Sequence, residues 1–95
     1  MSLLDDIKDR LGESSNESDL EVLDLIEAAK LEMESKGLDK SKIVETDPLV
    51  KQAIVLYCKA NYKYEDPKIA DRFQYIYEQT LNHMLLSGMY SVVME

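Results

Sequence analysis

The sequence offers one soft nucleophile and one imidazole, Cys58 and His83. A cysteine hydrolase needs the two side by side, with a carboxylate or amide that orients the imidazole. On a helical wheel, Cys58 falls on the back of one predicted helix and His83 on the flank of the next, which argues against a catalytic pair. Buried cysteines and single structural histidines are common. We therefore predict that the protein is not an enzyme.

The acidic residues near the N-terminus are the next candidates for chemistry. Asp5, Asp6 and Asp9 lie on a predicted helix, and the D-x-[DN]-x-[DN]-G loop of calcium sites does not occur in the sequence. The sequence also contains no glycine-rich phosphate loop, no G-x-S-x-G elbow and no histidine pair for zinc. A solvated helix face explains the carboxylates better than a metal site. We expect no metal and no cofactor.

Charge and composition limit the partners. The 95 residues carry a formal net charge of -8, all of it in residues 1–47, because residues 48–95 hold equal numbers of acids and bases. So acidic a chain is a poor ligand for the phosphates of DNA or for acidic lipids. A single cysteine excludes an internal disulfide, and the longest apolar run, residues 53–58, is far too short to cross a membrane. We expect a soluble, non-secreted protein.

Capping residues and apolar spacing predict an all-α fold in one domain, a small bundle of four helices. The expected helices are residues 2–11, 18–36, 48–64 and 67–87. Asp47-Pro48 and Asp66-Pro67 start the last two, since aspartate caps a helix and proline fits its first position. These two long helices are expected to pack as an antiparallel pair across the turn at Glu65-Asp66.

The first two helices are expected to begin at serines. Ser2 precedes the first, and Ser18 with Glu21 matches a capping box, which satisfies the first free amides of a helix. Gly12 and Gly37 are placed to end these helices, as Gly88 is for the fourth.

Three segments lie outside the predicted helices. Residues 13–17, ESSNE, have no apolar side chain to bury and are expected to form a loop. Residues 38–46 are expected to form an ordered connection, in which Ile43 and Val44 reach the core or make a short extended piece. Residues 89–95 are expected to be a flexible tail or a docking segment.

The last two helices carry more apolar side chains than one core stripe needs. The second helix has a single predicted core stripe, Val22, Ile26, Ala29 and Met33, flanked by Leu23 and Leu25, and its remaining faces are charged. The predicted core side of the third helix is Leu49, Val50, Ala53, Leu56, Tyr57, Ala60 and Tyr64. The predicted core side of the fourth is Ile69, Ala70, Phe73, Ile76, Tyr77, Thr80, Leu81 and Met84.

The backs of these two helices are candidate partner surfaces. On the third helix the back carries Val55, Cys58 and Tyr62. On the fourth it carries Tyr75, Gln79, Asn82 and Leu86, and Tyr90 extends it past Gly88. One small fold has difficulty covering four apolar faces, so we predict an interface here. The alternative is that the third helix is simply central and buried all round, with ordinary surface aromatics elsewhere.

Three stretches of the sequence resemble a known family. They are LEVLDLIEAA at residues 20–29, DPLVKQAIVLYCKANYKY at residues 47–64 and RFQYIYEQTLNHMLLSGMY at residues 72–90. The chain resembles the small helical head–tail connector proteins, also called head-completion or adaptor proteins, of tailed double-stranded DNA bacteriophages and prophages. The sequence departs from that resemblance after Gly88, where it reads MYSVVME.

The resemblance implies a structural virion subunit without catalytic residues. Such a subunit assembles in the host cytoplasm into a ring, expected to be a dodecamer on the portal protein, and takes part in DNA packaging and head completion. It joins the portal vertex to the stopper or tail-completion protein at the head–tail interface and continues the DNA channel. The predicted ring or portal contacts are the backs of the last two helices, and DNA passes without tight binding.

Acidity suits a conduit that must release DNA. We expect the acidic residues to face the channel or solvent: Asp5, Asp6, Asp9, Glu13 and Glu17, or Glu32 and Glu34. A bore lined by Lys51, Lys59 and Lys63 would contradict this. The alternative function is a small regulatory helical domain that binds DNA or a transcription protein; a subunit of a metabolic enzyme with a pocket around His83 is a third, minor option.

Overall fold

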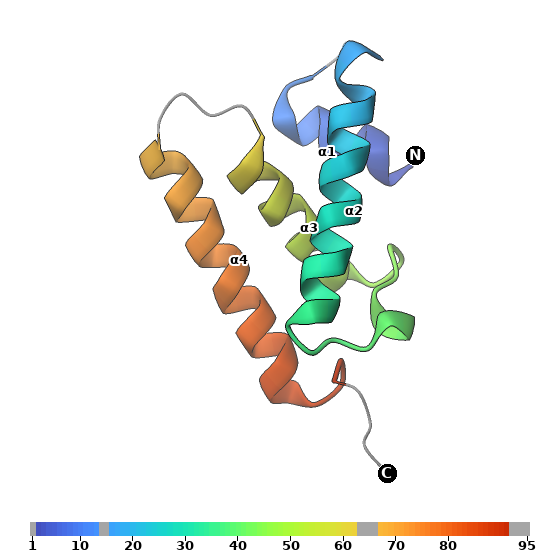
Figure 1. Ribbon diagram of the computed structural model, residues 1–95, viewed down its shortest axis with the longest axis vertical. Helices are drawn as coiled ribbons and strands as arrows, with labels where there is room; N and C mark the ends of the chain where they lie inside the picture. The colour runs from blue at the N-terminus through green and yellow to red at the C-terminus, as the bar shows by residue number, and fades with distance from the viewer. Residues whose placement is uncertain (1, 14–15, 63–66, 92–95) are drawn as a thin grey trace.

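A computed structural model describes residues 2–13, 16–62 and 67–91 of the chain (Figure 1). The helices of this part are α1 (Leu3–Leu11), α2 (Asp19–Ser35), α3 (Pro48–Asn61) and α4 (Pro67–Ser87), with short 3-10 helices η1 (Asn16–Ser18) and η2 (Lys40–Lys42). Within the described residues no strand forms, and one isolated antiparallel bridge joins Leu38 to Ser91. The predicted all-α fold of four helices is confirmed.

Local capping chemistry sets the starts of α1 and α3. The hydroxyl of Ser2 accepts a hydrogen bond from the amide of Asp5 at 3.2 Å. A carboxylate oxygen of Asp47 accepts from the amides of Leu49 and Val50 at 2.9 and 3.3 Å, with Pro48 in the first turn of α3. These caps satisfy amides that have no partner inside the helix.

The predicted ends of the helices hold with one exception. Gly12, Gly37 and Gly88 follow α1, α2 and α4 with φ angles of 77°, 114° and 73°, a region that favours glycine. The third helix ends at Asn61 instead of residue 64, and Tyr62 leaves it in an extended conformation. The predicted turn at residues 65–66 and the cap at residue 66 lie outside the described residues.

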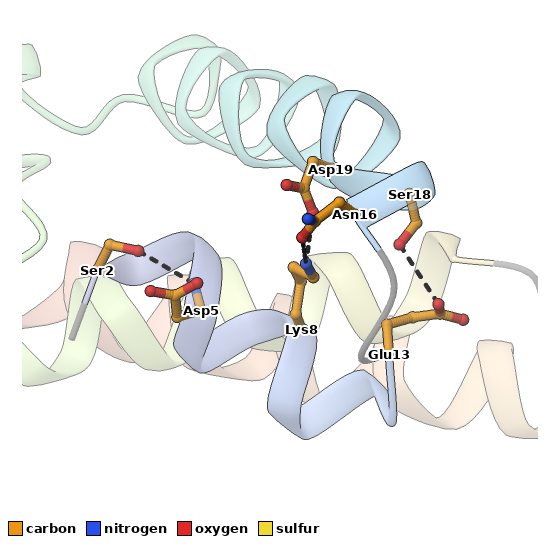
Figure 2. Close-up of polar contacts among 7 residues, drawn as sticks. All are labelled: Ser2, Asp5, Lys8, Glu13, Asn16, Ser18 and Asp19. Atoms are coloured by element: carbon orange, nitrogen blue, oxygen red, sulfur yellow. Dashed lines mark hydrogen bonds and ion pairs between the residues drawn. The ribbon is translucent and has the colours of Figure 1, made fainter.

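The Ser18 side chain does not cap α2 as the sequence predicted. Ser18 makes no capping hydrogen bond; it closes η1 with φ of −92° and ψ of 0°, whereas a capping residue is typically extended. Its hydroxyl instead donates to a carboxylate oxygen of Glu13 at 3.3 Å (Figure 2). Of the expected loop at residues 13–17, residues 16–17 belong to η1, and residues 14–15 lie outside the described part.

A buried lysine links α1 to the start of α2. Lys8 of α1 is 8% exposed, and its ammonium lies 2.5 Å from a carboxylate oxygen of Asp19 and 3.4 Å from the side-chain oxygen of Asn16 (Figure 2). The three residues belong to α1, η1 and the first turn of α2. This contact joins the two helices across the short connection.

The third helix is the centre of the bundle, with α2 and α4 on either side of it (Figure 1). α1, α2 and α4 all pack against it, and its buried residues point in every direction: Val50, Ala53, Ile54, Val55, Leu56 and Cys58. α4 runs antiparallel to α3, as predicted. Between the two helices the rings of Tyr57 and Tyr77 pack edge to face, with 5.4 Å between the ring centroids. The four-residue stripe predicted for α2 is buried as expected.

The chain returns from α4 to the connection between α2 and α3. The amide of Asp39 donates to the carbonyl of Tyr90 at 2.7 Å, and the Tyr90 hydroxyl donates to Asp47 at 2.8 Å. Tyr90 is 8% exposed and belongs to the core. Residues 89–91 thus begin the tail as an ordered return, whereas residues 92–95 lie outside the described part. Of the connection, Ile43 packs against the core and Val44 is exposed.

Candidate interaction surfaces

The back of α3 is not a surface. The side chains of Val55, Cys58 and Tyr62 are 4%, 0% and 5% exposed, so the expectation of a second open face on this helix is wrong. The alternative, a central helix, fits the structure better: α1, α2 and α4 all pack against α3, although Pro48, Gln52 and Asn61 stay exposed. Tyr90 is likewise buried and does not extend the stripe on α4.

The back of α4 is open along its length. Tyr75 is 62% exposed and Leu86 is 88% exposed, and Gln79 and Asn82 between them are exposed too. The structure thus brings these four predicted residues together on one open surface. Their contact with a partner stays a prediction.

Two residues predicted for the core of α4 join this open surface. Ile69 is 44% exposed and Ile76 is 37% exposed, whereas Tyr77, Leu81 and Met84 are buried. The reason is that α4 packs mainly against α3, so only a narrow stripe is covered. We call the whole open surface the α4 face; it comprises Lys68, Ile69, Asp71, Arg72, Tyr75, Ile76, Glu78, Gln79, Asn82, His83 and Leu86.

A second apolar surface lies on α2, where the sequence indicated only charged, solvated faces. Leu20, Leu23 and Leu31 are 77%, 45% and 61% exposed. Their positions at i, i+3 and i+11 place them on one side of the helix, opposite the buried stripe. The spacing of these three leucines was the feature of the sequence that could have predicted this surface. We call this surface the α2 face; it comprises Leu20, Leu23, Asp24, Glu27, Leu31 and Glu34.

The two faces differ in charge. The α2 face has three carboxylates, Asp24, Glu27 and Glu34, and Lys30 at its margin pairs with Glu45 at 3.8 Å. The α4 face carries both signs of charge, Lys68 and Arg72 together with Asp71 and Glu78. One open surface is therefore apolar and acidic, and the other is apolar with balanced charges and amide groups.

The acidic residues predicted to face a channel or solvent divide into two kinds. The exposed ones are Asp5, Asp9, Glu17 and Glu34, and the half-buried ones are Asp6, Glu13 and Glu32. Asp6 forms an ion pair with Lys51 of α3, and its hydrogen bond to that ammonium lowers the pKa of the Asp6 carboxyl. Burial and the nearby Glu32 carboxylate raise the pKa of both Tyr57 and Tyr77.

The residues considered for chemistry are not assembled into a site. Cys58 is fully buried in α3, and burial raises the pKa of its thiol to about 12, so almost no thiolate exists at neutral pH. His83 is exposed on α4. Among the described residues, no three histidine, cysteine or acidic side chains are grouped as metal ligands would be. The helices described here include none long and apolar enough to span a bilayer.

A helical bundle with two open apolar helix faces has the build of a structural protein that packs against other chains. The sequence profile of a family described as phage connector protein matches residues 3–91, nearly the whole chain. The chain therefore belongs to the phage connector family, and the resemblance seen in the sequence is confirmed at this level. No curated protein and no solved structure matches the chain. Membership supports a structural role at the head–tail junction of the virion.

Proposed function

We propose that this protein is the subunit of a ring that joins the portal vertex of a phage capsid to the stopper or tail and continues the DNA channel. Its family supports the connector role. One structural observation supports the ring: the open apolar side chains lie on two helices, α2 and α4, on either side of α3 (Figure 1). A ring of more than two copies needs two unlike patches on each subunit, whereas one self-complementary patch gives a dimer.

The size and number of exposed apolar side chains support association over a free monomer. Leu20, Leu31, Tyr75 and Leu86 are each more than 60% exposed. Scattered surface leucines are ordinary, but large side chains repeated along one helix side mark interaction surfaces. On the portal, the ring is proposed to be a dodecamer that also contacts the stopper or tail-completion protein.

The charge distribution supports a conduit that does not hold DNA. The exposed Asp5 and Asp9 on α1 repel phosphates, which lets DNA slide past. Two of the lysines that would instead grip DNA are engaged within the fold. Lys51 pairs with Asp6, and the ammonium of Lys59 lies 5.2 Å from the ring centroid of Phe73. Lys63 lies outside the described residues.

Co-assembly with the portal protein of the same phage tests the proposal. The two proteins are co-expressed, purified by size exclusion and imaged by electron microscopy, and we expect rings seated on the portal. Leu86→Asp should reduce the bound fraction, whereas Val44→Asp, on an apolar side chain 43% exposed outside both faces, should not. Failure of the wild-type chain to bind the portal would contradict the proposal. Salt-sensitive DNA binding by a monomer or dimer would favour the regulatory alternative.

A further inference from the structure

We infer that the α2 face of one copy of the chain docks into a groove on the opposite side of the next copy. The groove lies between α1 and α3, is lined by Arg10 of α1 and by residues of α3 from Pro48 to Lys59, and has a volume of about 370 Å³. We call it the α3 groove. The contact joins subunits of the proposed ring and therefore rests on that proposal. Three observations carry it: the positive charge of the α3 groove, its shape and its position opposite the α2 face.

The α3 groove is positively charged, although the chain has a formal net charge of -8. Its charged lining residues are all cations: Arg10, Lys51 and Lys59. The nearby carboxylate of Asp6 pairs with Lys51 and offsets one of the three charges, so the surplus stays positive. The ammonium of Lys59 lies over the ring of Phe73, a contact that leaves its charge in place. A groove of this charge attracts carboxylates.

The α2 face carries the complementary charge. Its charged members are three carboxylates, Asp24, Glu27 and Glu34, and Lys30 at its margin is paired with Glu45. The α4 face has balanced charges, and α1 exposes carboxylates but no large apolar side chain. Among the described helices, α2 is therefore the one that combines exposed leucines with an excess of acid. Complementary potentials favour this face in the α3 groove, and repulsion disfavours two α2 faces together.

The shape of the α3 groove suits a helix. Pro48, Gln52, Val55 and Lys59 recur at i, i+4, i+7 and i+11, so the groove follows one side of α3 for three turns, about 16 Å. Its floor is apolar, because Val55 and Leu56 belong to the core. The exposed leucines of the α2 face can pack on this floor and on the alkyl stems of the lysines, while the carboxylates beside them meet the cations.

The α3 groove and the α2 face point in opposite directions. α2 packs against both α1 and α3 and lies in front of them in Figure 1. None of the described residues that line the α3 groove belongs to α2, so the groove opens on the side of α1 and α3 that is turned away from α2. In a dodecameric ring, the two contacts of a subunit depart from opposite directions by only about 30°, one twelfth of a turn. Nearly opposite contacts therefore suit a ring of many copies, and they leave the α4 face for the portal or stopper.

Two variants that each block one side of the contact test the inference. Arg10→Glu reverses a charge in the α3 groove, and Leu31→Gln removes an apolar side chain from the α2 face; both side chains are exposed, so folding should be preserved. Each variant should self-associate about tenfold more weakly than the wild type, or less still. Their mixture should form a one-to-one dimer, because the intact α2 face of the first variant fits the intact α3 groove of the second.

Sedimentation velocity gives the association constants and the stoichiometry. Lys42→Glu and Met89→Gln are the matched controls, because they make comparable changes at exposed side chains outside the α2 face and the α3 groove. Both controls should associate as the wild type does. Added salt should weaken the association of all these proteins.

Three results would overturn the inference. The first is undiminished self-association of either blocked variant, and the second is a mixture that stays monomeric at millimolar concentration. The third is salt-sensitive binding of DNA that Arg10→Glu weakens, since the α3 groove would then hold phosphates. A chain that binds the portal but gives either of the first two results keeps the proposed function and loses only this subunit contact.

Discussion

The carboxylate of Asp47 is the site where one substitution should reveal most about the fold. Its oxygens accept the amides of Leu49 and Val50, which start α3, and the hydroxyl of Tyr90, which ties the chain after α4 to the same point. Loss of an N-cap costs about 1 kcal/mol. Loss of a hydrogen bond to a charged group costs about 1.5–3 kcal/mol. We therefore expect Asp47→Ala to lower the free energy of unfolding by roughly 2–4 kcal/mol.

Two further variants separate the two roles of Asp47. Tyr90→Phe removes only the hydrogen bond between the returning chain and the Asp47 carboxylate, so it should cost roughly 1.5–3 kcal/mol. Asp47→Asn keeps one oxygen, which can cap α3, and replaces the other with an amide group that can donate to the Tyr90 hydroxyl oxygen, so it should cost less than Asp47→Ala. Because Asp47 and Tyr90 share one bond, the double substitution should cost less than the sum of the single ones.

Urea unfolding followed by circular dichroism measures these differences, with the m-value checked for constancy across the variants. Asp47→Ala should cost more than Tyr90→Phe, because it also removes the cap. Equal costs for the two variants would refute the reasoning, since the cap would then contribute nothing. Additive costs in the double variant would refute the contact between Asp47 and Tyr90.

Three further outcomes follow from other groups. Lys8→Ala should lower the free energy of unfolding by about 2 kcal/mol in urea unfolding, because it leaves the partly buried carboxylate of Asp19 unpaired. The loss should be smaller in an Asp19→Asn background, where no charge is left unpaired. Cys58 should react with a thiol reagent at neutral pH only after unfolding, since burial raises its pKa to about 12; rapid reaction of the native protein would contradict this. The hydrogen bond from Lys51 lowers the pKa of the Asp6 carboxyl in the folded protein, so the free energy of unfolding should decrease as the pH is lowered below 3.8, the ordinary pKa of this group. Urea unfolding at several pH values measures this decrease, and Asp6→Asn should make it smaller.

The sequence predicted best what depends on neighbours within one helical turn. Ser2 and Asp47 cap their helices as expected, because a cap needs only the chemistry of one side chain and the next three amides. Ser18 has equally good local chemistry and still fails as a cap. The connection before α2 is turned into a 3-10 helix where buried Lys8 holds Asp19, a contact that the local pattern does not contain.

The helical wheel correctly predicted that apolar surface would stay open, but it placed part of that surface on the wrong helix. A chain of 95 residues has trouble covering every apolar face, and the structure does leave two faces open. Val55 and Cys58 of α3 are buried, however, and the exposed leucines lie on α2 instead. Which face is covered depends on how many helices reach it, and periodicity within one helix carries no information on that number.

The charge asymmetry of the sequence acquires a spatial meaning in the bundle. All of the net charge lies in residues 1–47, which include α1 and α2, while α4 belongs to the neutral half. If the α2 face contacts a neighbour, Glu34 is used in that contact and is no longer available to line a channel. The acidic residues left for the channel or solvent are then those of α1 and η1, chiefly the exposed Asp5, Asp9 and Glu17. The same excess of acid would thus lie on a contact surface of α2 and repel DNA on α1.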